Sequence, residues 1–366
     1  MALSIGIVGL PNVGKSTLFN ALTQAQNAAS ANYPFCTIEP NLAVVPVPDH
    51  RLEALAKLVD PAKITPATVD FIDIAGLVKG ASQGEGLGNK FLANIRDTQA
   101  ILHVVRCFDD PDVIHVDGSV NPIRDIEVVE TELILADAQT LERRVERMGK
   151  QIKGDKSLQP MLDLASALLA RLMTGQPARG FSDLETDHGR AFVAETSLLT
   201  LKPVIYCANV DDASLGQGNQ YVDQVREFAA SRGEAVVTIS ARMEEELVGL
   251  DPSERADFLE SFGVSESGLA QIIHTGYATL GLISYFTAGP KEVRAWTIRR
   301  GWKAPKAASV IHTDFEKGFI RAEIVGFDDY VAQGSESACR AAGLLRSEGK
   351  EYVVRDGDVV HFLFNV

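Results

Sequence analysis

The segment Gly9-Leu10-Pro11-Asn12-Val13-Gly14-Lys15-Ser16-Thr17 follows the apolar run Ile5-Gly6-Ile7-Val8 directly and opens a helix-like stretch. A phosphate-binding P-loop needs this order of strand, glycine-bearing loop and helix, because the loop turns successive N–H groups towards phosphate oxygens at the positive helix end. Lys15 is placed to reach the outer phosphates, and the Ser16 hydroxyl to bind Mg²⁺. A chance match in a glycine-bearing turn is the alternative, but motif, strand and helix coincide. The sequence therefore predicts a nucleoside triphosphate site, with contacts from Asn12, Val13, Gly14, Lys15, Ser16 and Thr17.

The composition is that of a globular chain. With 366 residues, 46% of them hydrophobic, the chain has room for about two domains with proper cores. The net charge of -14 argues against sequence-independent coating of nucleic acid or anionic membrane. The four cysteines lie far apart without metal-ligand spacing, which is typical of reduced thiols. No signal-like or membrane-spanning segment stands out, so we expect a cytoplasmic protein that binds neither membrane nor specific DNA.

Six apolar, β-branched runs alternate with helical patterns. Runs of this kind are typical of buried parallel strands, and their alternation with helices predicts a doubly wound α/β sheet of the Ras-like P-loop type. Ligands of such sheets bind at the carboxyl ends of the strands, where the P-loop also lies. The runs are Ile5–Val8, Leu42–Val47, Val69–Ile74, Ala100–Arg106, Pro203–Asn209 and Ala235–Ser240.

Between residues 123 and 201 the strand pattern gives way to helical periodicity. Apolar residues recur at three- and four-residue steps in two series, with Gly154 between them. This spacing predicts two antiparallel helices with a coiled-coil-like seam. Because strand patterns resume afterwards, we expect the hairpin, near residues 126–200, to be an insertion within a P-loop domain spanning 1–280. The series are Ile134, Ala138, Leu141, Val145, Met148 and Ile152, then Leu158, Leu162, Ala165, Leu169 and Leu172.

The last part of the chain, residues 281–366, shows short strand-like runs separated by glycines and acidic turns. This pattern predicts a small α+β unit. The expected strands are Ala295–Arg299, Ser309–Ile311, Ile320–Val325 and Val359–Phe364.

Two further segments are expected to supply residues that bind Mg²⁺ and the γ-phosphate. Asp73 ends a predicted strand and can hold Mg²⁺ through water, while Gly76 can offer its N–H to the γ-phosphate. Thr37 lies where a switch segment supplies a second hydroxyl to Mg²⁺, although a turn threonine is the alternative. Leu77 stands where Ras-like enzymes place a glutamine that orients water, so another group must position water if hydrolysis occurs.

The loops after the later strands are expected to read the base. Asn209 and Asp212 occupy the place of the Asn-Lys-x-Asp element of GTPases, and Ser240 and Ala241 occupy the last nucleotide loop. Val210 replaces the lysine that covers the base, whereas Asp212 keeps a carboxylate able to accept from guanine. These residues alone do not decide whether the site binds an adenine or a guanine nucleotide.

Taken together, these motifs resemble the Obg-like ATPase (YchF) family over essentially the whole chain. Such a resemblance implies a Ras-like domain with a helical hairpin, a C-terminal TGS-like (β-grasp) module, a hydrophobic residue in place of the catalytic glutamine, preference for ATP over GTP, and association with ribosomes. The family usually carries Asn-x-x-Glu at the base loop, where this chain has Asp212. The motifs are Gly9–Ser16, Tyr33–Asn41, Asp73–Ala81 and Gly84–Asn89.

Two candidate catalytic features accompany the P-loop. Asn12 matches an asparagine that seats a monovalent cation in potassium-stimulated P-loop enzymes, so K⁺ can supply positive charge at the transition state; a polar turn residue is the alternative. His115 lies between the fourth strand and the hairpin, and a loop histidine is a proposed catalytic group in the family. Its imidazole can orient or deprotonate water, although most loop histidines have no chemical role.

Basic residues cluster in two places against the acidic background. One cluster lies on the predicted hairpin and the other surrounds Trp296 and Trp302. Such clusters can contact ribosomal RNA, or can simply be solvated faces. We therefore expect an ATP-hydrolysing, Mg²⁺-dependent switch; the alternatives are a GTPase and a nucleotide-gated ribosome adaptor with incidental hydrolysis. The clusters are Arg143, Arg144, Arg147, Lys150, Lys153 and Lys156, and Lys291, Arg294, Arg299, Arg300, Lys303 and Lys306.

Overall fold

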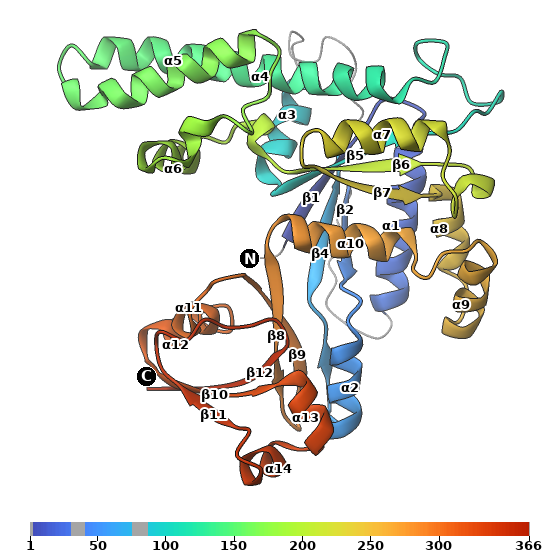
Figure 1. The fold of residues 1–366 in the computed structure, drawn as a ribbon, viewed down its shortest axis with the longest axis vertical. Helices are drawn as coiled ribbons and strands as arrows, with labels where there is room; N and C mark the ends of the chain where they lie inside the picture. Colours follow the sequence, from blue (N-terminus) through green and yellow to red (C-terminus); the bar gives the residue numbers. More distant parts are fainter. Residues whose placement is uncertain (1–2, 31–40, 75–86, 366) are drawn as a thin grey trace.

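The computed structural model describes residues 3–30, 41–74 and 87–365, and these residues form two six-stranded sheets (Figure 1). The first sheet has the strand order β2-β4-β1-β5-β6-β7. Each of the six predicted runs forms one of its strands, so the α/β prediction is confirmed. The strands are β1 (Leu3–Val8), β2 (Leu42–Pro46), β4 (Thr68–Asp73), β5 (Ala100–Arg106), β6 (Val204–Asn209) and β7 (Ala235–Ile239).

The strand β2 differs from the predicted parallel arrangement, because it runs antiparallel to β4. After β2 the chain forms α2 (His50–Val59) and the short strand β3 (Ile64–Thr65), which is an edge strand of the second sheet, and then returns as β4. Because β4 runs antiparallel to β2, the chain can return from this segment to β4 without a connection that crosses the face of the sheet. The other neighbouring pairs among the described strands of this sheet are parallel.

Helices cover both faces of the first sheet. Figure 1 shows α4 and α7 on one side and α1 and α10 on the other. As expected for a sheet covered on both faces, every residue of β5 and of β6 is buried. The helices of this part are α1 (Lys15–Ser30), α3 (Leu87–Asp97), α4 (Pro122–Gln151), α7 (Gln220–Ala230), α8 (Ala241–Leu247), α9 (Pro252–Ser261) and α10 (Gly268–Thr279).

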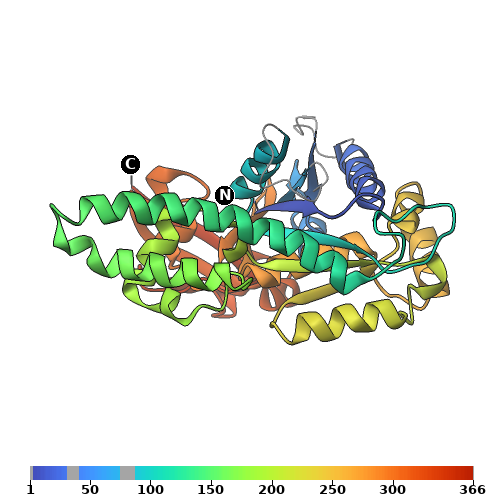
Figure 2. The ribbon, with the colours of Figure 1, turned by 90° about the horizontal axis from the view of Figure 1, so that it is seen from above.

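The predicted helical hairpin is formed by α4 and α5 (Gln159–Met173), and it extends well beyond the sheet (Figure 2). Its core is separate from that of the sheet and includes Leu141 and Ala165. The predicted seam of α5 was partly wrong, because Leu164 and Leu168 are buried whereas Leu158 and Leu162 are only partly covered. The helix α6 (Asp187–Glu195) also packs on this core through Phe192, which widens the buried face beyond a two-helix seam.

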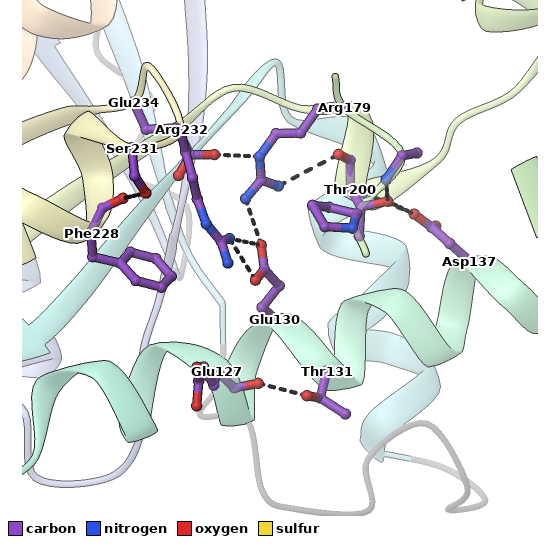
Figure 3. A network of polar contacts seen from close by, with 12 residues as sticks. Glu127, Glu130, Thr131, Asp137, Arg179, Thr200, Phe228, Ser231, Arg232 and Glu234 are labelled. Atoms are coloured by element: carbon purple, nitrogen blue, oxygen red, sulfur yellow. Dashed lines mark hydrogen bonds and ion pairs between the residues drawn. The ribbon is translucent and has the colours of Figure 1, made fainter. Parts of the chain in front are cut away.

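A polar network fastens the first half of α4 to the α/β domain (Figure 3). Glu130 accepts hydrogen bonds from Arg179 at 2.6 Å and from Arg232 at 2.7 Å. Seven residues further along the same helix, Asp137 accepts from the backbone N–H and the hydroxyl of Thr200. Arg179 in turn contacts Glu234. The 30-residue helix α4 therefore forms one arm of the hairpin and is also hydrogen-bonded to the α/β domain.

Replacing Glu130 by glutamine tests this attachment. The free energy of unfolding is expected to fall by about 2 kcal/mol, because the guanidinium groups of Arg179 and Arg232 lose their shared carboxylate. The expected loss is smaller than for a fully buried ion pair, because Arg232 is partly exposed to solvent. Urea unfolding followed by circular dichroism measures the change. Glu142→Gln, at an exposed position of the same helix, is the control and should stay within about 0.5 kcal/mol of the parent. Equal stability of both variants would contradict the structural role of the network.

The second sheet has the order β11-β10-β12-β8-β9-β3, and β3 joins it from the N-terminal part of the chain. Residues Ser309–Ile311, predicted as a strand, instead form a turn after α11, with the Ile311 N–H bonded to the Ala308 carbonyl. Two apolar residues, Val310 and Ile311, are too few to specify a strand where the preceding helix continues into a turn. The remaining strands are β8 (Leu282–Ala288), β9 (Val293–Arg299), β10 (Phe319–Gly326), β11 (Arg346–Glu348) and β12 (Asp358–Phe364). The remaining helices are α11 (Ala304–Ala308), α12 (Thr313–Lys317), α13 (Phe327–Gln333) and α14 (Glu336–Ala341).

Among the helices of the described ranges, none combines the length and the apolar character needed to cross a lipid bilayer.

Candidate nucleotide-binding site

The P-loop connects β1 to α1 and has the tight backbone that its glycines predict. Asn12 and Gly14 have φ angles of 61° and 93°, in the left-handed region that glycine and asparagine adopt most readily. At Gly9 a Cβ atom would lie 2.7 Å from the Val104 carbonyl oxygen, so the loop passes too close to β5 for any side chain. Helix α1 begins at Lys15, directly after the loop. The first N–H groups of a helix have no partner within it, so this helix end suits an anion.

Lys15 and Asp73 form an ion pair across this loop, and both side chains are largely covered. Asp73 ends β4, the strand next to β1, so its carboxylate reaches the P-loop from the neighbouring strand. Ser16 lies exposed in the first turn of α1. A hydroxyl and a carboxylate are the oxygen donors that Mg²⁺ prefers, so these two residues suit that metal.

Asn209, predicted as a base contact, lies between the P-loop and the start of α8. Its Nδ2 donates to the Val13 carbonyl at 2.9 Å, and its Oδ1 accepts from the Ala241 N–H at 2.9 Å. The side chain is almost wholly buried. The Asn209 amide therefore ties together the loops that follow β1, β6 and β7.

The other predicted base-loop residues meet beside Asn209. The Ser240 hydroxyl donates to Asp212 Oδ1 at 2.7 Å and also caps α8 by accepting from the Met243 N–H. Asp212 itself is partly exposed at the start of a short 3-10 helix, Asp212–Ser214. Val210, which stands at the place of the GTPase lysine, is buried. The structure thus brings Asn209, Asp212, Ser240 and Ala241 to one edge of the sheet.

The loop between β5 and α4 touches the P-loop directly, because Asn12 Nδ2 donates to the Ile114 carbonyl at 3.0 Å. Arg106, at the end of β5, is buried and donates to the carbonyls of Phe108, Asp110 and Val113. The next residue, Cys107, is also buried, and burial raises the pKa of its thiol to about 12. This thiol stays protonated at neutral pH, which excludes it as a nucleophile.

His115 lies in the same loop but points inward. Its Nε2 lies 2.8 Å from Asp125 Oδ2, and its Nδ1 accepts the N–H of Asp117 at 3.1 Å. Asp125 stands in the first turn of α4 and is buried. Sequence reasoning did not single out Asp125 or Arg106. Arg106 ends an apolar run and Asp125 lies among other charged residues, and neither pattern identifies a partner.

Three residues predicted for this site or beside it, Thr37, Gly76 and Leu77, lie outside the described residues.

Some residues of the basic clusters make contacts within the chain. Arg144 pairs with Glu195 at 2.6 Å, Arg294 covers the ring of Trp296 at 3.9 Å, and Lys306 lies 5.6 Å from the ring of Trp302. These contacts place the chain's own cations over the two indole rings, where an RNA base would otherwise stack. The basic residues that remain exposed at the hairpin end are Arg143, Arg147, Lys150, Lys153 and Lys156.

Comparison with known proteins gives consistent matches. Residues 282–365 match the family model YchF-GTPase_C, described as a protein of unknown function, and residues 4–145 match MMR_HSR1, described as 50S ribosome-binding GTPase. The chain is 53% identical to "Ribosome-binding ATPase YchF" of Pasteurella multocida over the full length of both chains, and 52% identical to the Bacillus subtilis protein of the same name, also over full length. The solved structure of the Schizosaccharomyces pombe YchF GTPase is 41% identical and superposes with a TM-score of 0.88, covering 99% of this chain and 97% of that one.

Proposed function

The chain belongs to the YchF family, and we propose that it is an ATP-hydrolysing molecular switch that associates with the ribosome. The observation that carries the proposal is the P-loop, whose Lys15 forms an ion pair with Asp73 at the end of the neighbouring strand β4. A P-loop lysine and an aspartate on the adjacent strand support binding of the outer phosphates and Mg²⁺. Relatives of the same length, at 52% to 53% identity, are named ribosome-binding ATPases.

The phosphate and metal roles follow from this loop. The backbone from Asn12 to Thr17 and the Lys15 ammonium hold the phosphates, and Gly76 donates its N–H to the γ-phosphate. Ser16 and Thr37 would hold Mg²⁺ directly, and Asp73 would hold it through water. When bound, the metal neutralises charge on the phosphate oxygens. In that arrangement Lys15 would turn from Asp73 to the phosphates.

Two groups are candidates for the role of the missing glutamine. His115 is proposed to orient or accept a proton from water, and K⁺ held by the Asn12 side-chain oxygen to add positive charge. Asn12 Nδ2 already contacts the His115 loop through Ile114. The residues proposed for these two roles, Asn12 and His115, therefore lie on the same side of the P-loop.

The base site is proposed to prefer ATP and to use Asn209, Asp212, Ser240 and Ala241. Asp212 is the residue that keeps a GTPase-like contact possible, because one oxygen bonds Ser240 and the other can accept from guanine. Asp212→Glu moves that oxygen by one methylene. We expect GTP affinity to fall about tenfold, as for loss of one charged hydrogen bond, while ATP affinity stays within about threefold.

Competition titrations of ATP and GTP, with and without K⁺, measure these affinities. Asp223→Glu is the matched control, since Asp223 is an exposed residue of α7 that faces Arg226 rather than the base loop. Tighter binding of GTP than of ATP by the parent protein would contradict the ATP assignment. Absence of saturable binding of either nucleotide in the presence of Mg²⁺ would overturn the proposed function. Nucleotide-dependent co-sedimentation with ribosomes tests the second half of the proposal.

A further inference from the structure

Both ring nitrogens of His115 are engaged inside the protein. Because Nδ1 accepts the Asp117 N–H, the ring proton lies on Nε2, and Nε2 donates it to Asp125 Oδ2. The His115 side chain is only 4% exposed. A general base needs a free lone pair directed at the water that it activates. In this conformation His115 has neither the free lone pair nor access to water.

We propose that Asp125 is a positioning residue that holds His115 in an inactive orientation, and that ATP turnover requires this hydrogen bond to open. The proposal rests on the proposed function, in which His115 acts on the attacking water. It adds the regulation of that step: the fraction of molecules with His115 released sets the basal rate.

The residues beside His115 show what holds the loop. Ile114 is 78% exposed and Val116 is 56% exposed, whereas the histidine between them is buried. This is the reverse of ordinary burial, in which apolar side chains lie inside and polar ones outside. The segment is therefore held by polar contacts, namely His115 with Asp125 and Asn12 with the Ile114 carbonyl. A segment with little apolar burial opens more readily than a packed one.

The surroundings confine this opening to the segment after Val113. On one side, Arg106 anchors the loop through the carbonyls of Phe108, Asp110 and Val113. On the other side, Asp125 is fixed in the first turn of α4, next to Ile126 in the core of the sheet. Asp125 Oδ1 also accepts from Arg124 at 3.1 Å, so its carboxylate keeps a cationic partner when His115 leaves. Release of His115 thus leaves no buried charge unpaired.

The test compares ATP turnover of Asp125→Ala, Asp125→Asn, His115→Ala and the double variant with Ala at both positions. Asp125→Ala is expected to raise basal kcat about three- to tenfold with KM within about twofold, because more molecules have His115 released. Asp125→Asn should give a smaller rise, since its amide oxygen still accepts the hydrogen bond without the charge. The double variant should match His115→Ala. Asp112→Asn is the control, because Asp112 is an exposed residue of the same loop.

Three results would overturn the proposal. A fall in kcat for Asp125→Ala as large as that of His115→Ala would mean that Asp125 orients the histidine for catalysis. A rise that persists in the double variant would mean that the effect does not pass through His115. Unchanged turnover of both aspartate variants would mean that the hydrogen bond does not limit the rate. Selective ¹⁵N labelling of histidine adds a direct readout: the Nε2–H form is expected for His115 in the nucleotide-free parent, and the Nδ1–H form would contradict the assignment.

Failure of the proposal is distinguishable from failure of the proposed function. If His115→Ala turns over ATP like the parent, the histidine has no catalytic role and Asp125 has nothing to regulate, while the ATPase assignment survives. If the parent protein binds no ATP, the ATPase assignment itself fails. Thermal unfolding shows whether Asp125→Ala is folded, and Asp125→Asn carries the test if it is not.

Discussion

Replacing Lys15 by methionine is expected to lower ATP turnover by about two to three orders of magnitude, the usual cost of removing a preorganised charge that stabilises a transition state. Methionine keeps most of the apolar stem of lysine but removes its charge. The substitution also leaves Asp73, the partner of Lys15, without its cation. In the variant no ammonium group balances the charge of the phosphate oxygens that Lys15 would hold, so ATP affinity is expected to fall as well.

Phosphate release under saturating Mg²⁺-ATP, together with equilibrium binding of a fluorescent ATP analogue, measures both effects. Lys57→Met is the control, because Lys57 is an exposed lysine in the last turn of α2. Its turnover should equal that of the parent. If Lys15→Met retained more than about a tenth of the parental rate, the assignment of this loop as the catalytic phosphate site would be wrong.

Replacing Gly14 by alanine is expected to disrupt nucleotide binding almost as severely, for a reason that combines strain and collision. Gly14 has a φ of 93°, which an alanine adopts only with strain. Its Cβ would lie 2.1 Å from Asn209 Nδ2. The Asn209 amide must then move, which breaks its bonds to the Val13 carbonyl and the Ala241 N–H. We expect a loss of about 3 to 4 kcal/mol, or roughly two to three orders of magnitude in ATP affinity.

Gly149→Ala provides the matched control for this glycine. Gly149 lies within α4, and a Cβ there would meet no heavy atom within 4 Å. Alanine in place of a helical glycine is expected to stabilise the protein by about 0.5 to 1 kcal/mol without changing ATP affinity. Isothermal titration with ATP and urea unfolding separate the two cases. Wild-type ATP affinity of Gly14→Ala would show that the P-loop binds nucleotide in a different backbone conformation.

The first sheet was predicted from hydrophobic periodicity and from the alternation of strand and helix patterns along the chain. Its six strands were found because buried β-branched runs contrast strongly with the helices between them. The direction of β2 was not predictable from this pattern, since a buried strand has the same composition whether its neighbour is parallel or antiparallel. The pattern also did not predict β3, because its two residues form a strand only through pairing with β9.

The candidate site divides in a similar way. The sequence identified Asn209 and Asp212 from their place after a strand, but not that Asn209 would lock Val13 to Ala241. It pointed to His115, but not to Asp125, which lies ten residues along the chain and on the inward face of a helix. Pairwise contacts of this kind depend on which faces meet, and a single sequence records no such pairing.

The P-loop, its lysine and its serine were determined by the sequence alone, because a strand, a glycine-bearing turn and a helix are local structures specified by neighbouring residues. Tertiary structure alone decided how the site is closed: the Asn209 amide reaches a P-loop carbonyl 196 residues away, and Asp125 fixes the orientation of His115. The physical reason is that backbone conformation follows from residues adjacent in the chain, whereas hydrogen bonds between distant side chains exist only after burial of the sheet and helices has brought their elements together.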